Sequence, residues 1–211
     1  MSSALPPLLV ITDRHATGGR PLVEVVRAAL EGGARLIQLR EKDLDGGPLL
    51  ALAAELVREA RRFEARVLVN DRIDVALAAG AAGVVLPADS FPTETARGLL
   101  GAFALLARST HSTAEAESAA REGCDFALFG PVFATPSKAA YGAAQGIERL
   151  SEACRAPLPV YAVGGVTAEN AAAVRRAGAA GAAVIREVMA AKDPRRATAA
   201  LLAALGERAL A

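Results

Sequence analysis

The segment from Asp125 to Gly142, DFALFGPVFATPSKAAYG, joins an apolar run to a loop that carries hydroxyl and ammonium groups. The run at 126–129 predicts a buried strand that ends at Gly130-Pro131. The groups in the loop are Thr135, Ser137 and Lys138. Loops on a rigid scaffold often carry function, and hydroxyls beside an ammonium bind anions. The segment therefore indicates an anion site, with a solvated surface loop as the competing interpretation.

The segment QLREK places Gln38, Arg40 and Lys42 two residues apart. In an extended strand, residues at this spacing face the same side. Two neighbouring cations repel each other unless an anion joins them, and a diphosphate suits them because arginine binds it bidentately and lysine as a point charge. The alternative is that both cations pair with the acidic residues at 41, 43 and 45 on a solvated surface.

Asn70 and Asp71 end another apolar run. A carboxylate and an amide at the end of a strand can hold Mg²⁺, which takes few protein oxygens and completes its shell with phosphate and water. Asp71 can also be the N-cap of the next helix, because Asn and Asp lead the N-cap preferences. The two roles are compatible.

A histidine follows the fifth apolar run, in the sequence Ser109-Thr110-His111. A histidine at the end of a strand can act as a general acid or base, although a lone histidine is often structural. The second histidine, His15, lies in a loop beside Asp13 and Arg14 and has the weaker claim, although that loop can close over a site.

Glycines and a cation end the last two apolar runs. Gly164 and Gly165 let backbone N–H groups approach a phosphate closely. Arg186 follows the final run and can face the same phosphate. Paired glycines are a weak signal by themselves, and their position after a strand gives them weight.

These residues follow short apolar runs that alternate with alanine-rich amphipathic segments. We predict strands at 8–12, 35–40, 66–70, 83–87, 103–109, 126–130, 159–163 and 181–185. We predict helices at 22–31, 48–63, 73–79, 93–100, 113–121, 146–154, 168–177 and 194–208, with Thr167 as the N-cap of the seventh. Continuous apolar runs are typical of parallel strands covered on both faces.

Eight strand–helix units predict an α/β fold, a single (β/α)₈ TIM barrel over residues 1–211. Catalytic groups of such barrels collect at the carboxyl ends of the strands, which is where the polar residues above lie. An open doubly wound sheet is the alternative, but no Gly-x-Gly-x-x-Gly follows the first strand.

The composition limits the classes of partner. The chain is 53% hydrophobic with a net charge of +1, so it can fill a core and shows no general nucleic-acid or membrane surface. Cys124 and Cys154 are too few for a disulfide framework, and we expect buried thiols in a cytoplasmic protein. We predict no signal peptide, and no apolar run reaches the ~18 residues that a membrane span needs.

Five motifs, QLREK, NDR, STH, GPVFATPSK and AVGGV, resemble in order and spacing those of the thiamine phosphate synthase/TenI family. The resemblance implies a (β/α)₈ barrel and a transferase that joins hydroxymethylpyrimidine diphosphate to thiazole phosphate, with Mg²⁺. It implies phosphorylated pyrimidine and thiazole as small-molecule partners, and it leaves a homodimer open.

The resemblance also assigns roles to individual residues. The residues around the pyrimidine diphosphate would be Gln38, Arg40, Lys42, Asn70, Ser109 and Lys138. Asp71 would be a Mg²⁺ ligand. The thiazole phosphate would be held by Thr135, Ser137 and the Gly165 amide.

The chain departs from the synthase pattern at two positions. Ser90 stands where the synthases carry a second metal-binding aspartate, and Asp89, one residue earlier, is our candidate for that ligand. Arg186 replaces a serine. The segment LPADSF resembles the TenI branch, a thiazole tautomerase in which His111 would be the acid/base. We favour the synthase because the diphosphate-binding set is nearly complete. The tautomerase and a non-catalytic phosphate-binding barrel are the alternatives.

Overall fold

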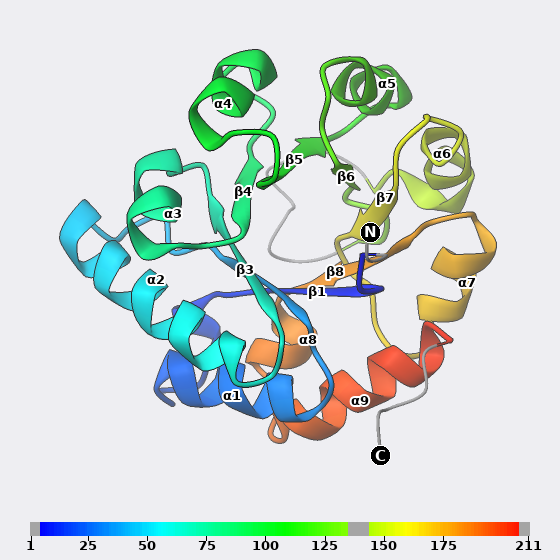
Figure 1. Ribbon diagram of the computed structural model, residues 1–211. Helices are drawn as coiled ribbons and strands as arrows, with labels where there is room; N and C mark the ends of the chain where they lie inside the picture. Colours follow the sequence, from blue (N-terminus) through cyan, green and yellow to red (C-terminus); the bar gives the residue numbers. More distant parts are fainter. Residues whose placement is uncertain (1–4, 135–143, 207–211) are drawn as a thin grey trace.

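The computed structural model describes residues 5–134 and 144–206, in which eight parallel strands close into a barrel ringed by helices (Figure 1). The strands are β1 (Leu8–Ile11), β2 (Leu36–Leu39), β3 (Arg66–Asn70), β4 (Gly83–Leu86), β5 (Leu105–Thr110), β6 (Phe126–Phe129), β7 (Val160–Val163) and β8 (Gly181–Val184). Each pairs with the next, and β8 pairs with β1. The predicted (β/α)₈ barrel is confirmed.

The helices lie outside this barrel (Figure 1). They are η1 (Arg14–Ala16), α1 (Leu22–Glu31), α2 (Gly46–Arg61), α3 (Ile73–Ala79), α4 (Thr93–Leu100), α5 (Thr113–Arg121), α6 (Gly146–Ala153), α7 (Ala171–Arg176), α8 (Arg186–Met189) and α9 (Pro194–Ala204). Four of the predicted helices, α1, α3, α4 and α5, have the predicted bounds. The 3₁₀ helix η1 and the four-residue helix α8 were not predicted.

Side chains alternate along each strand between the barrel interior and the helices. Leu36, Leu68, Val85 and Ala107 pack together inside the barrel, while their sequence neighbours pack against the helices. The side chains that face the barrel interior recur at every second residue, up to the carboxyl ends of the strands. Polar residues there therefore lie at one rim, which we call the mouth of the barrel.

The start of α7 differs from the prediction. Thr167 was predicted as N-cap, but the helix begins at Ala171 and Asn170 is the N-cap. Asn170 accepts a hydrogen bond from the Thr167 N–H and donates one to the Gly165 carbonyl, both at 2.9 Å. The prediction was wrong because these side-chain bonds stabilise a loop that competes with the helix.

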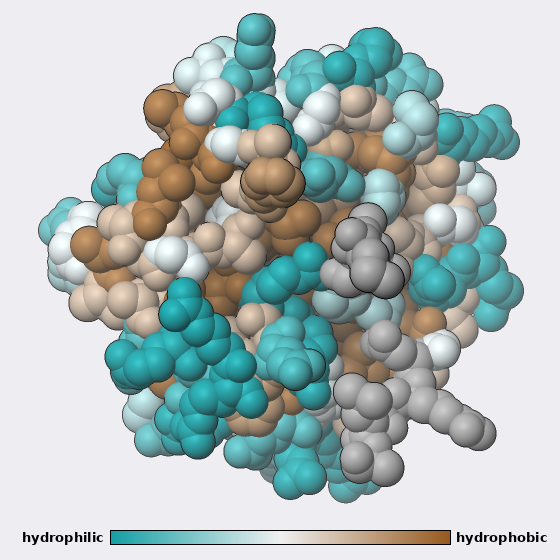
Figure 2. Space-filling view, viewed as in Figure 1, coloured by the Kyte–Doolittle hydropathy of each residue, from teal (hydrophilic) through white to brown (hydrophobic). Residues whose placement is uncertain are grey.

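The outer surface over α3 and α4 is more apolar than its surroundings (Figure 2). Leu77, Leu99 and Phe103 are among the exposed large apolar residues of these elements and the turn after α4. Phe103 was predicted to begin the fifth strand, but it is fully exposed, and the strand begins at Leu105. No described helix is long and apolar enough to cross a membrane.

Both cysteines are free, as expected. Cys124 is buried and Cys154 is half-buried. Burial raises the pKa of the Cys154 thiol to about 11. The two thiols therefore behave as packing groups in this fold.

Candidate active site

Gln38 and Asn70 meet at the mouth, where β2 and β3 end. Gln38 Nε2 donates to Asn70 Oδ1 at 3.1 Å. Gln38 is only 2% exposed, and its Oε1 is buried with no hydrogen-bond partner among the described residues. Leaving a buried acceptor unpaired costs about 1–3 kcal/mol. The pair therefore offers an acceptor that a donor group on a ligand can satisfy.

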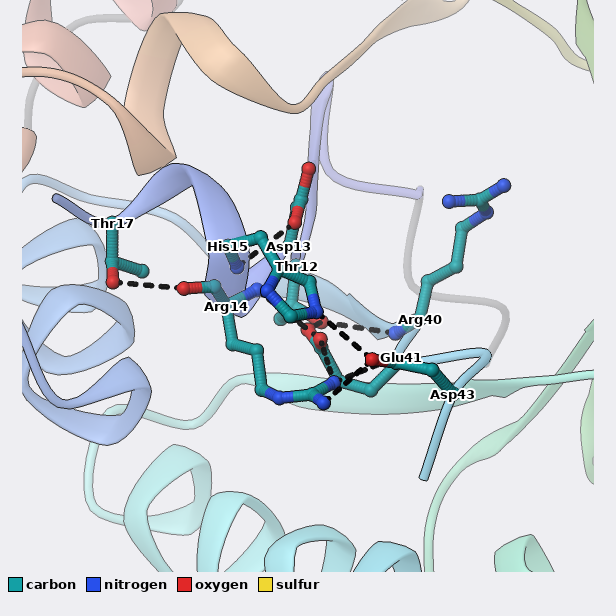
Figure 3. A network of polar contacts seen from close by, with 8 residues as sticks. All are labelled: Thr12, Asp13, Arg14, His15, Thr17, Arg40, Glu41 and Asp43. Atoms are coloured by element: carbon teal, nitrogen blue, oxygen red, sulfur yellow. Dashed lines mark hydrogen bonds and ion pairs between the residues drawn. The ribbon is translucent and has the colours of Figure 1, made fainter. Parts of the chain in front are cut away.

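Arg40 and Lys42 extend this polar edge, and their side chains are not neutralised by their acidic neighbours. The alternative in which they pair with Glu41, Asp43 or Asp45 is wrong within the part of the chain that the structure describes. Glu41 and Asp43 pair with Arg14 instead, and the Arg40 guanidinium points away from that cluster (Figure 3). The two cations are therefore available to an anion.

Asp71 follows β3 directly and has a left-handed backbone, with φ of 65°. This conformation is uncommon for residues other than glycine. Its N–H donates to the Val85 carbonyl at 3.0 Å, and its carboxylate accepts a hydrogen bond from the Ser90 hydroxyl. The predicted N-cap role is wrong: Arg72 occupies the N-cap position of α3, and no side-chain cap is formed. Asp71 faces the loop after β4 instead.

A pocket of about 240 Å³ lies at the ends of β2, β3 and β4, and Gln38 and Arg40 are not among its lining residues. Its lining includes Lys42, Asn70, Asp71 and Pro87. Larger hollows of about 400 and 550 Å³ lie between outer helices, at the residues of α1 and α9 and of α6 and α7. We take the smaller pocket as the candidate site because it brings the Lys42 cation, which follows β2, to the amide and the carboxylate at the end of β3.

The donors near Asp71 bear on the predicted Mg²⁺. Ser90 contacts Asp71, whereas Asp89 is exposed and forms no hydrogen bond within the described residues. The described residues also contain no cluster of three or more His, Cys, Asp or Glu suited to a metal. A carboxylate with one hydroxyl fits Mg²⁺ only where phosphate and water supply the other oxygens. Asp89 as second ligand stays a prediction.

His111 lies just beyond β5, two residues after the half-buried Ser109. Its backbone N–H donates to Glu115 at 2.8 Å, and its ring Nδ1 lies 3.5 Å from the same carboxylate oxygen. Ser112 caps α5 by accepting from the Glu115 N–H. Glu115 therefore holds the start of α5 and the histidine together. The side chain of His111 is 39% exposed, so its ring remains accessible.

Gly164 and Gly165 bring the loop after β7 against the segment after β6. Both have positive φ, 94° and 66°, and the Phe133 N–H donates to the Gly164 carbonyl at 3.0 Å. A Cβ on Gly165 would lie 2.7 Å from Phe133 Cβ, and one on Gly164 would lie 2.8 Å from Pro131 Cα. The close approach requires glycine at both positions. The predicted residues Thr135, Ser137 and Lys138 lie outside the described residues.

A family model described as thiamine monophosphate synthase matches residues 8–188. The chain belongs to this family. It is 49% identical to a putative thiamine-phosphate synthase of Geobacter sulfurreducens, over 95% of each chain. It is 44% identical to a thiamine-phosphate synthase of Roseiflexus castenholzii, over 94% of this chain and 88% of the relative.

A solved structure resembles the whole barrel. The thiamine phosphate pyrophosphorylase from Pyrococcus furiosus superposes with a TM-score of 0.86 at 37% identity, covering 95% of this chain and 96% of the other. A 3-hexulose-6-phosphate synthase superposes with a TM-score of 0.67 at 20% identity, which indicates a shared fold alone.

Within the thiamine monophosphate synthase family, this chain differs at the end of the last strand, where Arg186 stands in place of a serine. Arg186, predicted beside the phosphate, is exposed and begins α8 directly after β8. The next residue, Glu187, has its pKa raised by burial and then by the nearby Glu169 carboxylate. At this strand end, an exposed arginine therefore precedes a partly buried glutamate in the chain.

Our sequence reasoning missed the network of Thr12, Arg14, Glu41 and Asp43 (Figure 3). The available signal was Thr-Asp-Arg directly after the first strand, which brings three polar residues to the mouth. Their partners lie 27–29 positions away in the chain, so the pairing itself had no sequence signal.

Proposed function

We propose that this protein is a thiamine-phosphate synthase, which couples hydroxymethylpyrimidine diphosphate with thiazole phosphate and releases diphosphate. The observation that carries the proposal is the pair of unneutralised cations, Arg40 and Lys42, which follow β2 at the rim where Gln38 contacts Asn70. Similarity to named synthases over nearly the whole chain supports it.

The reaction needs a site that stabilises a leaving diphosphate. The bond between the pyrimidine methylene carbon and the diphosphate oxygen breaks, and both electrons leave with the oxygen. Arg40 and Lys42 stabilise the charge that grows on the diphosphate. The thiazole nitrogen then donates its lone pair to the methylene cation and forms the new C–N bond. No protein nucleophile takes part, and the family role of Lys138 is to add a third cation.

Binding of the two substrates follows from the same groups. The unpaired Gln38 Oε1 accepts a hydrogen bond from a donor on the pyrimidine, and Asn70 keeps the Gln38 amide oriented. Ser109 lies on the same side of the barrel, at the end of β5. Gly164 and Gly165, with Thr135 and Ser137, form the proposed seat of the thiazole phosphate, and Arg186 flanks it.

Mg²⁺ is part of the proposal. Asp71 would hold it with help from Ser90 or Asp89, and the bound ion would neutralise diphosphate charge. We further propose a cytoplasmic enzyme without nucleic-acid or membrane partners, in line with the small net charge of +1 and the two free thiols. A homodimer stays a proposal, which sedimentation velocity can test.

The direct test is to incubate the protein with both phosphorylated substrates and Mg²⁺ and to measure thiamine phosphate by mass spectrometry. Product formed at enzymatic turnover supports the synthase. Binding of both substrates without product, seen as a rise in melting temperature, would instead support a binding-only barrel.

The second candidate is the tautomerase. The observation that favours it is the contact of Ser90 with Asp71, because a hydroxyl there takes the place of the second metal-binding carboxylate of the synthases. That reaction moves a proton on the thiazole carboxylate phosphate and would use His111 as acid/base. His111→Ala separates the two: we expect coupling to fall only slightly in a synthase, and isomerisation to be lost in a tautomerase. A severe loss of coupling would contradict our assignment.

A further inference from the structure

The loops after β1 and β2 are joined by a network of charged side chains (Figure 3). Its centre is Glu41, a carboxylate whose side chain is 2% exposed, and it lies between Arg40 and Lys42 in the sequence. A buried carboxylate between two cations would be expected to pair with one of them. In this protein it does not.

Glu41 is bound by the loop after β1. It accepts hydrogen bonds from the Thr12 hydroxyl at 2.7 Å, from the Arg14 N–H at 3.1 and 3.2 Å, and from Arg14 Nη1 at 3.2 Å. The Thr12 hydroxyl also accepts from the Arg40 N–H at 2.9 Å. Thr12 therefore fixes the backbone of Arg40, while Glu41 is held on the side away from the Arg40 guanidinium.

Asp43 is bound by the same arginine. Arg14 Nη1 and Nη2 donate to its two oxygens at 2.5 and 2.6 Å, and His15 Nε2 lies 2.9 Å from one of them. Arg14, and then His15, lower the pKa of the Asp43 carboxyl well below its usual range. One guanidinium thus contacts both carboxylates that flank Lys42 in the chain.

We propose that Arg14 is a positioning residue, which keeps Arg40 and Lys42 available for a diphosphate by occupying Glu41 and Asp43. The inference rests on the proposed synthase function, because it concerns the same anion. Without the Arg14 charge, Glu41 and Asp43 would be free to turn toward Arg40 and Lys42, which are their neighbours in the chain. Ion pairing to those cations would then compete with ligand binding.

The competing interpretation is that Arg14 only fixes the loops. The two interpretations differ in what neutralising the carboxylates does. If the loss in an Arg14 variant comes from ion pairs that Asp43 or Glu41 forms with Arg40 and Lys42, removing those charges restores binding. If the loss comes from a disordered loop, removing those charges does not restore binding.

The test is calorimetric titration of the whole protein with inorganic diphosphate and MgCl₂. We expect Arg14→Gln to weaken binding by about tenfold, because two competing ion pairs near the surface each contribute up to about fivefold. Arg27→Gln is the matched control, because Arg27 binds Glu59 at 2.8 Å between α1 and α2, away from the mouth. It should leave the affinity unchanged.

The second arm is rescue. Arg14→Gln/Asp43→Asn and Arg14→Gln/Glu41→Gln should each recover several-fold of the lost affinity, and Arg14→Lys should retain most of it. In turnover, Arg14→Gln should raise KM for the pyrimidine diphosphate and leave KM for thiazole phosphate unchanged. Circular dichroism at the titration temperature confirms that each variant is folded.

If Arg14→Gln is unfolded, the diphosphate affinities of Arg14→Lys and Asp43→Asn are compared with that of the wild type. A tenfold loss of affinity in Arg14→Lys then contradicts the inference.

The outcomes separate the inference from the function on which it rests. If the wild type binds no diphosphate, the proposed function fails. If the wild type binds diphosphate and Arg14→Gln binds it equally well, the positioning role of Arg14 fails and the function stands. A loss in Arg14→Gln that neither double variant reduces also overturns the role, because a structural effect of Arg14 then accounts for it.

Discussion

Gly165→Ala provides a sharp test of the phosphate seat. Gly165 has φ of 66° and lies against the segment after β6. An added Cβ would lie 2.7 Å from Phe133 Cβ and 3.0 Å from the Ala134 carbonyl oxygen. A left-handed backbone costs an L-residue about 1–2 kcal/mol. Overpacking adds about 1–3 kcal/mol, so we expect a total loss of about 2–5 kcal/mol in the free energy of unfolding.

Gly18→Ala is the matched control. Gly18 has the same φ of 66°, but an added Cβ meets nothing within 4 Å. Its substitution therefore carries the backbone cost of about 1–2 kcal/mol without the steric one. The difference between the two variants isolates the packing of the loop after β7 against the segment after β6.

The assay is urea denaturation at equilibrium, with the slope m checked for constancy between variants. Because a chain of about 200 residues loses about 2–4 °C of melting temperature per kcal/mol, thermal melts should rank the variants in the same order. We also expect Gly165→Ala, unlike Gly18→Ala, to raise KM for thiazole phosphate. Equal unfolding free energies for the two variants would refute the reasoning, since they would show that the close approach carries no energetic cost.

Two other predictions concern charge. Ser90→Asp should tighten Mg²⁺ binding about tenfold in calorimetry with inorganic diphosphate present, because affinity follows the number of charged ligands. Asp89→Asn in the wild-type background should weaken that binding, and an unchanged affinity would exclude Asp89 as a ligand. Glu59→Gln should destabilise the fold near neutral pH. Arg27, the main cause, and Arg62 lower the pKa of Glu59, so its contribution is full above the ordinary value of 4.5 and is lost as pH falls. Urea midpoints of the two proteins should converge in acid, and a constant gap would contradict this.

Much of the barrel followed from local pattern. The continuous apolar runs gave the strands, because parallel strands in a barrel are covered on both faces. The positions of Gln38 and Arg40 in the sequence also predicted polar groups at the carboxyl end of β2, where the structure has them. Gln38 and Asn70 were both predicted at the site, and the hydrogen bond between them follows once β2 and β3 pair in parallel.

The two helix N-caps at the mouth were not predictable from residue preference alone. Asp71 was suited to the N-cap, yet it faces Ser90 across the gap between β3 and β4. Thr167 is not the N-cap of α7, because Asn170 forms hydrogen bonds with the loop that precedes the helix. The Asp71 bond joins residues 19 positions apart, which local sequence does not specify. The Asn170 bonds are local, and there two short-range preferences of the same segment compete.

The segment from Gln38 to Asp43 shows why an alternating run of charges need not be a solvated surface. Glu41 and Asp43 contact Arg14, whereas Arg40 and Lys42 have no ion-pair partner among the described residues. The two signs are therefore separated into different contacts, although they alternate in the chain. A synthase needs this separation because its diphosphate must find unpaired cations. A tautomerase, whose chemistry depends on His111, has less reason to keep it, and the segregation of charge along this one segment therefore favours the synthase.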